Sequence, residues 1–159
     1  KKATELVPDA YNMKSSRVIV VVGEKHDKLW DNIYDVFEGN VSREKIDSFK
    51  NGYGTILYFY DRDTVKNLAE KFPLYAEKFP MWSLQSAGML QFTIWAGLRE
   101  LNIGASLQHY DPVIDDMVRQ MFDIPESYIL NAQMPFGGIG LSPKDKAKED
   151  ISKRVSIIK

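Results

Sequence analysis

The run MWSLQSAGMLQFTIWAGL, Met81–Leu98, contains no charged residue, and the segment GASLQHYDP follows it at residues 104–112. Most helices of soluble proteins keep a charged or polar face toward water. This run has no charged face. We therefore predict a long helix over Met81–Asn102 that is buried on nearly all sides, either within its own domain or against a second copy of the chain.

Membrane insertion is the other way to bury such a helix. The run reaches only the lower limit of spanning length. It also contains Ser, Gln, Thr and Gly, and it lacks the density of Leu, Ile and Val found in lipid-facing helices. We expect no membrane association, and a central buried helix is the favoured interpretation.

The composition is that of one globular domain covering residues 1–159. Hydrophobic residues make up 44% of the chain and charged residues 27%, which argues against disorder. The formal net charge is −1, with Lys and Arg spread along the chain, so we expect no nucleic-acid partner. The chain has no cysteine, which excludes disulfides and thiolate chemistry, and no signal-peptide pattern; we expect a cytoplasmic location.

Predicted strands and helices alternate, which favours a layered α/β or α+β domain over a helical bundle. Runs rich in β-branched and aromatic residues predict strands over Arg17–Val22, Thr55–Tyr60 and Tyr128–Pro135. Apolar spacing and capping residues predict helices over Glu24–Phe37, Ser42–Lys50, Asp61–Phe72 and Pro112–Phe122.

The helix ends and the remaining connections carry their own signals. Expected N-caps are Ser42, Asp61 or Asp63, and Asp111, the last with Pro112 in the first turn of its helix. Residues 105–108 are expected to be short and extended. Residues 151–158 are expected to form a terminal strand or an arm.

Side chains suited to acid–base or metal chemistry are few. His26 lies in the polar segment EKHDK and is expected to be solvated. His109 is either a hydrogen-bonded loop residue or a group beside a cofactor, and no second ligand at metal-site spacing accompanies it. The FGGIG segment at 136–140 is interpreted as a tight turn after a strand, because it does not match the G-x-G-x-x-G phosphate loop.

A polar cluster, YNMKSSR at residues 11–17, leads directly into the first predicted strand. Amide and hydroxyl groups at a strand end commonly serve in turns. Together with a guanidinium they can also recognise hydroxyls and a phosphate. From spacing alone, both interpretations stay open.

Four segments of the chain, taken together, match a known family pattern: PDAYNMKSSRVIVVVGEKHDKLW, FKNGYGTILYFYD, FPMWSLQSAGMLQFTIWAGLRELNIGASLQHYDPVID and ILNAQMPFG. They resemble the nitroreductase superfamily. More narrowly, they resemble its small subfamily of FMN-dependent oxidoreductases described as fatty-acid-repression or stress-related nitroreductases. The similarity covers nearly the whole chain, and the GASLQHY block is its most specific part.

This resemblance implies an α+β sandwich with a mixed, mainly antiparallel central sheet. It also implies an intertwined homodimer, with the long central helix in the interface and two FMN molecules between the subunits. NAD(P)H would reduce FMN, which would then reduce a nitroaromatic, quinone or similar acceptor in a ping-pong cycle. Because the flavin carries the chemistry, no catalytic side chain and no metal site are expected.

The resemblance also assigns residues of the polar cluster to the FMN site. Asn12 matches an amide near the flavin ring and ribityl chain. Ser15, Ser16 and Arg17 match the family's Ser-Ser-Arg element. We expect Ser15 to lie nearest the flavin and Arg17 to be more structural.

Two later segments complete the expected site. One is similar to the segment that lies along the isoalloxazine ring, where backbone N–H groups approach N5 and O4: Leu107, Gln108, His109 and Tyr110. The other is the basic pair Lys153 and Arg154, which matches a pair near the C-terminus that can meet the phosphate.

Two positions depart from the family pattern. Asp9 stands where the family has a small hydroxyl residue, and Lys14 stands where it has Gln. We expect Lys14 to compensate the acid, or to contact N1 and O2 of the flavin in place of that Gln. The family also opens with an Arg-Arg-Ser/Thr element that grips the FMN phosphate, and we expect this element, with an N-terminal helix, upstream of Lys1.

These observations predict an FMN-dependent NAD(P)H oxidoreductase that works as a homodimer. Two other classes stay open. One is a non-catalytic, flavin-poor homologue that acts as a binding or regulatory protein, which the departures at Asp9 and Lys14 favour. The other is a plain interaction domain whose buried helix serves dimerisation only.

Overall fold

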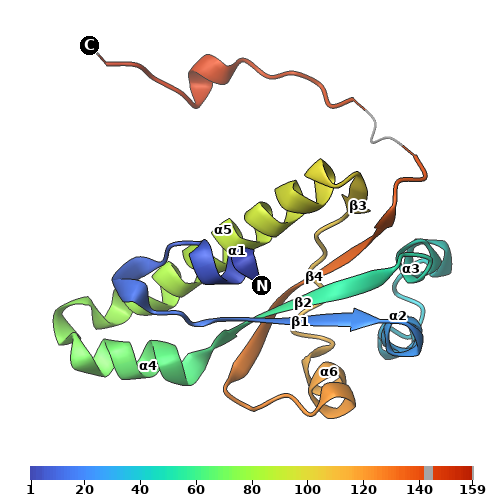
Figure 1. The fold of residues 1–159 in the computed structure, drawn as a ribbon, viewed down its shortest axis with the longest axis horizontal. Helices are drawn as coiled ribbons and strands as arrows, with labels where there is room; N and C mark the ends of the chain where they lie inside the picture. The colour runs from blue at the N-terminus through green and yellow to red at the C-terminus, as the bar shows by residue number, and fades with distance from the viewer. Residues whose placement is uncertain (142–144, 159) are drawn as a thin grey trace.

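A computed structural model describes residues 1–141 and 145–158. Within these residues, four strands form one antiparallel sheet in the order β1-β2-β4-β3 (Figure 1). The strands are β1 (Ser16–Val22), β2 (Gly54–Asp61), β3 (Ile103–Ala105) and β4 (Tyr128–Gly138). The three strands predicted from β-branched and aromatic runs are confirmed.

The strand β4 is longer than its apolar run indicated. Gly137 and Gly138 pair with β3, so the interpretation of FGGIG as a tight turn was wrong, because its first three residues continue the strand. A close backbone approach requires glycine at position 137. A Cβ atom there would lie 2.9 Å from the backbone nitrogen of Tyr53, closer than real Cβ contacts allow.

Helices cover both faces of this sheet. In the described residues the α-helices are α1 (Lys2–Leu6), α2 (Glu24–Val36), α3 (Arg43–Lys50), α4 (Arg62–Lys71), α5 (Phe79–Glu100) and α6 (Asp115–Phe122). The 3₁₀ helices there are η1 (Ala10–Asn12), η2 (Pro73–Lys78) and η3 (Ile151–Lys153).

Two of the expected N-caps are confirmed. The Ser42 hydroxyl accepts a hydrogen bond from the Lys45 N–H at 3.1 Å. The Asp61 carboxylate accepts one from the Asp63 N–H at 3.2 Å. The expected cap of α6 was wrong: the helix begins at Asp115, after a turn, because the Asp111 carboxylate instead accepts a hydrogen bond from Gln133.

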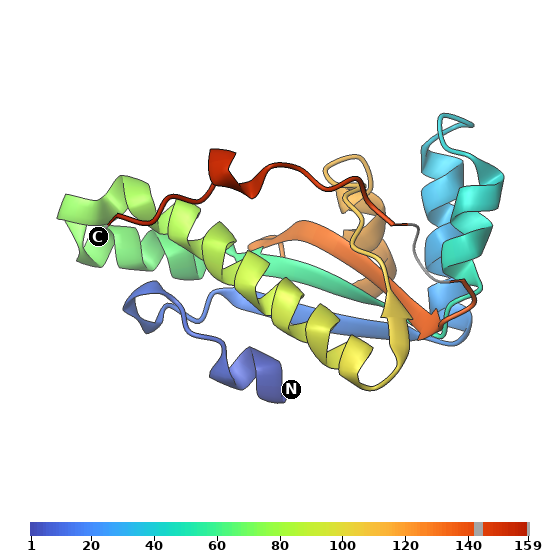
Figure 2. The same cartoon turned by 90° about the horizontal axis from the view of Figure 1, so that it is seen from above.

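Alternation along the strands sends side chains into two separate cores. Leu57 and Phe59 of β2 pack with α2, α3 and α6 on one face. Ile56 and Tyr58 of the same strand face α5 on the other. The sheet is therefore the middle layer of a sandwich, with α5 running diagonally across one side (Figures 1 and 2).

The long helix α5 buries only one face within a single chain. Its inner residues recur at helical spacing: Ser83, Ser86, Ala87, Leu90 and Gln91. Its outer residues are exposed, and they include Met81, Leu84, Met89, Phe92 and Trp95. The helix is thus not covered on all sides within its own chain, and cover by a second copy, the other option, stays a prediction. Among the helices of the described residues, none combines the length and apolar character that a membrane crossing needs.

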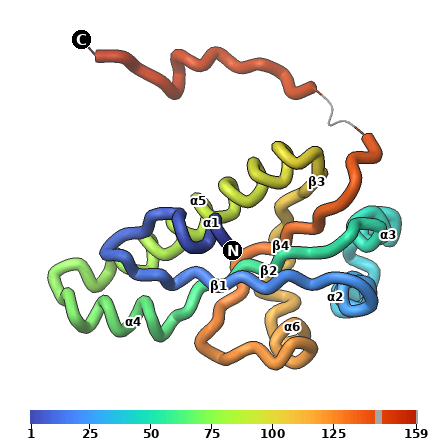
Figure 3. The backbone as a smooth tube through the Cα atoms, in the orientation of Figure 1, coloured from blue at the N-terminus to red at the C-terminus, as the bar shows by residue number. Residues whose placement is uncertain are grey.

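The C-terminal residues 145–158 form an arm that runs apart from the sheet (Figure 3). Its one regular element in the described residues is η3, so the arm expectation is confirmed and no terminal strand forms within one chain. The apolar side chains of Val155, Ile157 and Ile158 are exposed.

The expectation that His26 is solvated was wrong. Its side chain is 1% exposed. The Trp30 Nε1–H donates to Thr55 Oγ1 at 2.9 Å, and the Thr55 hydroxyl lies 3.0 Å from His26 Nδ1. Because the Lys50 carbonyl 3.1 Å from Nε2 can only accept, Nε2 carries the proton and Nδ1 accepts from Thr55. The four groups form one satisfied chain of hydrogen bonds between α2, α3 and β2.

Replacing Thr55 by valine tests this network. The change keeps the shape of the side chain but leaves the Trp30 N–H and His26 Nδ1 buried without a partner. We expect the free energy of unfolding to fall by about 2 kcal/mol, measured by urea denaturation. Ser48→Ala, which removes an exposed hydroxyl, should change it by less than about 0.5 kcal/mol. A Thr55→Val midpoint equal to that of the wild type would contradict the network.

Candidate functional site

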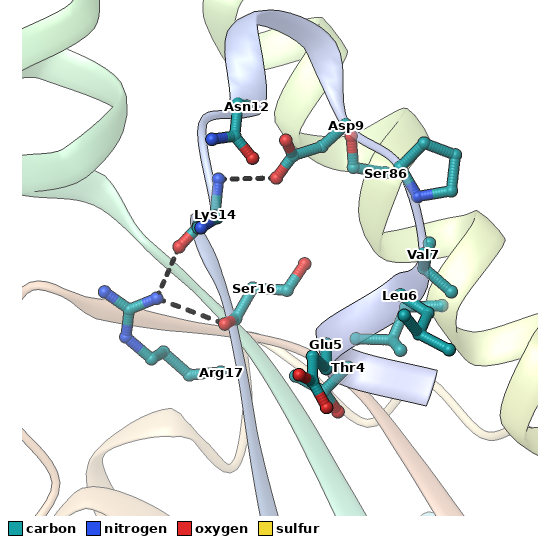
Figure 4. Close-up of a pocket in the computed structure, with 12 residues that line it drawn as sticks. Thr4, Glu5, Leu6, Val7, Asp9, Asn12, Lys14, Ser16, Arg17 and Ser86 are labelled. Carbon is teal, nitrogen blue, oxygen red and sulfur yellow. Dashed lines mark hydrogen bonds between the residues drawn. The ribbon is translucent and has the colours of Figure 1, made fainter. Parts of the chain in front are cut away.

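A cavity of about 460 Å³ lies where the N-terminal segment passes between β1 and α5 (Figure 4). It is open to solvent on one side and mixes polar and apolar groups. The lining residues from the N-terminal segment and β1 are Thr4, Glu5, Leu6, Val7, Pro8, Asp9, Asn12, Lys14, Ser16 and Arg17. Those from α5 are Ser86 and Leu90.

The turn that borders this cavity has an unusual backbone. Tyr11, Asn12 and Lys14 all have positive φ, at 57°, 50° and 53°. A left-handed conformation costs a residue other than glycine of order 1 kcal/mol, and such residues cluster at functional sites. The Asp9 carboxylate accepts a hydrogen bond from the Lys14 N–H and closes the turn (Figure 4).

This contact explains the acid at position 9. The carboxylate of Asp9 accepts a hydrogen bond from a backbone amide five residues further along the chain. The Lys14 ammonium forms no ion pair with any residue of the described part of the chain. It therefore remains available at the edge of the cavity as a positive charge.

Arg17 anchors the other side of the same turn. Its Nη1 donates to the Lys14 carbonyl at 2.7 Å and to the Ser16 carbonyl at 3.1 Å. Its Nη2 forms an ion pair with Asp61 at 2.8 Å, and its Nε donates to the Tyr128 hydroxyl at 3.0 Å. The backbone of Lys14 is thus held at both its N–H and its C=O, and Arg17 acts mainly as a structural clamp, as expected.

The pKa of Asp61 lies below its usual value. Burial of this carboxyl, which is 13% exposed, opposes ionisation. Hydrogen bonds from Thr64 and Ser127 and the charge of Arg17 outweigh that effect and stabilise the carboxylate. Asp61 is therefore ionised near neutral pH and serves both as the N-cap of α4 and as the partner of Arg17.

Asp61→Asn should lower the free energy of unfolding by about 1–2 kcal/mol at pH 7, because it weakens the cap and the ion pair. A lowered folded-state pKa contributes stability above the unfolded value, 3.8, and that contribution is lost as the pH falls below it. The difference between wild type and variant should therefore shrink below about pH 4 in urea denaturation. Asp63→Asn, on the exposed side of the same turn, should show a smaller difference. An Asp61→Asn difference that stays constant from pH 7 to pH 3 would contradict this role.

The two serines before Arg17 have different environments. Ser15, expected nearest the flavin, is fully buried, and its hydroxyl lies 2.8 Å from that of Ser83 on α5. Ser16 lines the cavity instead. The side chain of Ser15 therefore joins β1 to α5, and among these two serines only Ser16 can reach a ligand in the cavity.

The segment after α5 lies at the opposite edge of the sheet, beside β3. The N–H groups of Ser106, Gln108 and Tyr110 are bonded to β4: to the Pro135 carbonyl, the Gln133 carbonyl and the Gln133 side chain. Within the described residues, the alternate N–H groups of Leu107 and His109 have no hydrogen-bond partner. In an edge strand these alternate groups point away from the sheet.

The side chains of this segment have different positions. Tyr110 packs in the core against Trp30 and Phe37, so its ring is a core element rather than part of a surface site. The Gln108 amide folds back on Ser106 Oγ at 2.7 Å. Leu107 packs on the α5 side of the sheet, and His109 is exposed.

Within one chain the predicted site residues do not meet. The turn at 12–17 begins β1 at one edge of the sheet, whereas 107–110 follow β3 at the other edge. Lys153 and Arg154 lie in the C-terminal arm, and α5 separates that arm from the N-terminal segment (Figure 2). Arg154 pairs with Glu149 at 2.6 Å. Joining the three groups into one site requires more than one chain.

Three contributing residues escaped the sequence interpretation: Ser83, Asp61 as the partner of Arg17, and Gln133. The signal for Gln133 was a polar residue inside the buried strand run ILNAQMPF. Such a residue needs hydrogen-bond partners, which the sequence could not identify. Among the described residues, no group of His, Asp or Glu side chains is arranged to hold a metal ion.

An antiparallel sheet with a long helix across one face defines an α+β sandwich, and the cavity where that helix meets the edge strand is its candidate ligand site. The model of the nitroreductase family matches residues 1–138. This chain belongs to the nitroreductase family.

Individual relatives agree with this assignment. The putative nitroreductase HBN1 from Saccharomyces cerevisiae is 30% identical over 147 residues, which is 91% of this chain and 75% of HBN1. Nitroreductase FRM2 from the same yeast is 28% identical over 140 residues, 87% of this chain and 72% of FRM2. The structure of nitroreductase CinD from Lactococcus lactis in complex with nicotinic acid is 39% identical, with a TM-score of 0.95 over 99% of this chain and 84% of CinD. CinD has also been solved with chloramphenicol and with 4-nitrophenol.

Family membership supports a flavin oxidoreductase kind of function, and members of the family generally bind flavin. The predicted α+β sandwich with a long central helix is confirmed, and every strand pairing in residues 1–141 and 145–158 is antiparallel.

Proposed function

We propose that this protein is an FMN-dependent oxidoreductase that passes reducing equivalents from NAD(P)H to nitroaromatic, quinone or similar acceptors in a ping-pong cycle. Membership in the nitroreductase family supports the reaction class. Two compounds solved with CinD, chloramphenicol and 4-nitrophenol, carry an aromatic nitro group, which supports the acceptor class. The observation that carries the proposal is the cavity at the start of β1, bordered by an amide, a hydroxyl and an ammonium that forms no ion pair within the described residues.

The residues around that cavity fit a flavin mononucleotide. Lys14 offers a positive charge, Asn12 an amide, and Ser16 a hydroxyl to an electron-rich ring edge, a ribityl chain or a phosphate. The unpaired N–H groups of Leu107 and His109 suit acceptor atoms on the edge of a planar ring. When bound, the flavin supplies the hydride and electron transfer, so the protein needs no acid–base pair of its own.

The chain's own residues would bind and orient the cofactor. Asp9 and Arg17 hold the Lys14 backbone, and so direct the Lys14 side chain and Ser16 to the cavity. Leu90 and Ser86 of α5 form the far wall. We propose that Lys153 and Arg154 add positive charge for the phosphate across a subunit boundary.

A homodimer is part of the proposal, because the two halves of the site lie at opposite edges of one chain's sheet. Three exposed apolar surfaces support it. The first is the outer face of α5, and the second is the α5-side face of β1, where Val20 and Val22 are exposed. The third is the C-terminal arm with Val155 and Ile157. Stable dimers bury such surfaces between their subunits.

The non-catalytic alternative loses its main support in this geometry. Asp9 favoured it because an acid beside a phosphate or a pyrimidine edge is costly unless it is paired. The Asp9 carboxylate instead closes the turn through the Lys14 amide. The departure at Lys14 is the observation that still favours this alternative.

Titration of FMN with the purified chain tests the proposal. We expect quenching of flavin fluorescence that saturates at one FMN per chain, and oxidation of NADH or NADPH when a nitroaromatic or quinone is added. Lys14→Met should weaken FMN binding about tenfold, the usual effect of losing a charge-assisted hydrogen bond. The exposed Lys25→Met, beyond the other end of β1, is the matched control. A chain that binds no flavin and oxidises no NAD(P)H would contradict the proposal and favour a binding or interaction protein.

A further inference from the structure

Gln133 of β4 binds the segment 106–111 through both its backbone and its side chain. Its backbone exchanges both hydrogen bonds with Gln108: Gln108 N–H to Gln133 O at 2.7 Å, and Gln133 N–H to Gln108 O at 2.9 Å. Its side chain, which is fully buried, reaches two residues further along. The Tyr110 N–H donates to Gln133 Oε1 at 2.7 Å, and Gln133 Nε2 donates to Asp111 Oδ1 at 3.3 Å.

The chemistry of these partners fixes the orientation of the Gln133 amide. A backbone N–H can only donate, and a carboxylate can only accept. The side chain between them must therefore present one acceptor and one donor on the same planar group. Of the side chains with this length, only glutamine provides both, which explains an uncharged polar residue in an otherwise apolar strand.

This clamp continues the pairing with β4 beyond the last regular residue of β3. Strand β3 ends at Ala105, yet Ser106, Gln108 and Tyr110 still donate to β4. For the Tyr110 N–H, the acceptor is the Gln133 side-chain oxygen rather than a backbone carbonyl of β4. The alternate N–H groups of Leu107 and His109 consequently keep the outward direction of an edge strand.

We infer that Gln133 is a positioning residue for the flavin, acting through the 107–109 segment. This inference rests on the proposed function. Gln133 itself lies on the face of the sheet occupied by α2, α3 and α6, with the Tyr110 ring, and so does not touch the cofactor. Gln133 orients the outward N–H groups of Leu107 and His109, to which the edge of the flavin ring would bind.

Gln133→Met tests the inference, because methionine matches the length and volume of glutamine but offers neither hydrogen bond. We expect faster hydrogen exchange at the Tyr110 amide, measured by mass spectrometry on peptides spanning 104–112, and FMN affinity at least tenfold weaker. Thr55→Val is the matched control. It removes a buried hydrogen-bonding group from the same face of the sheet, and it should leave both FMN affinity and exchange in 104–112 unchanged.

A second pair of variants separates positioning from stability. Gln133→Glu alone keeps the acceptor for Tyr110 but sets a carboxylate against Asp111. Combining Gln133→Glu with Asp111→Asn exchanges donor and acceptor across the second bond and keeps the charge constant. We expect the combined variant to bind FMN more tightly than Gln133→Glu alone and to recover at least part of the wild-type flavin spectrum.

Hydrogen exchange and FMN affinity, measured together, test the clamp and its role toward the flavin separately. Unchanged exchange in Gln133→Met would overturn the clamp, and faster exchange with wild-type FMN affinity would overturn its role toward the flavin. Equal loss of FMN affinity in Thr55→Val would assign the effect to general destabilisation. If the wild-type chain binds no FMN, the proposed function fails with the flavin part of this inference, while the exchange data still decide whether Gln133 holds the segment.

Discussion

Phe92→Asp is expected to leave the chain folded and to abolish its self-association. The Phe92 side chain is 70% exposed in one chain and lies on the outer face of α5 among other exposed apolar side chains. A large aromatic residue at the centre of an interface commonly contributes 2 kcal/mol or more, and an unpaired charge there adds a desolvation penalty. The dimer dissociation constant should therefore rise about 100-fold or more.

Sedimentation velocity over a range of micromolar concentrations measures this effect. The matched control is Val113→Asp, an equally polar change at an exposed residue before α6, on the other side of the sheet. FMN affinity should fall together with association in Phe92→Asp, because the proposed site joins two chains. A wild-type chain that sediments as a monomer, or a Phe92→Asp dimer as tight as wild type, would refute the proposed homodimer.

Leu90→Asp, two residues away on the same helix, should instead destroy the fold. Leu90 is 2% exposed and lies on the inner face of α5, which packs on the sheet. Leu90 borders the cavity, but with only 2% of its surface exposed a carboxylate there would be largely removed from water. We expect the free energy of unfolding to fall by about 3 kcal/mol or more, with loss of cooperative unfolding in urea.

Leu90→Met is the control for this change, since it conserves volume and should cost less than about 1.5 kcal/mol. The contrast between positions 90 and 92 is informative, because the same aspartate is placed on opposite faces of one helix. A Leu90→Asp variant with a wild-type denaturation midpoint would show that the inner face of α5 is not packed as described.

Local patterns predicted most of the fold. The strand β2 and the caps Ser42 and Asp61 followed from residues within a few positions of one another. The helix α5 followed from a run without charge, although the run alone could not separate a helix covered by its own domain from one left half open. A run of uncharged residues indicates that a segment is buried, but it does not indicate whether the same chain or a second chain covers it.

The candidate site was predicted in outline only. The turn at 12–17 does border a cavity, and Arg17 is structural as expected. The sequence did not show that the Ser15 hydroxyl meets Ser83, 68 positions away, or that Ser16 lines the cavity. His26 was misjudged for the same reason: a polar neighbourhood in the sequence indicated solvent, while its partners Thr55 and Lys50 come from other elements.

The amino-acid sequence by itself determined the order and kind of the elements and the family resemblance, because helices, strands and caps depend on nearby residues. Only the tertiary structure decided which polar groups are occupied and which remain available. Gln133 binds Tyr110 and Asp111 across the sheet, and Asp9 closes the turn at Lys14. Such hydrogen bonds form wherever the folded chain brings a donor and an acceptor to within about 3 Å of each other. The two residues can be far apart in the sequence, so a local sequence pattern cannot predict the pair.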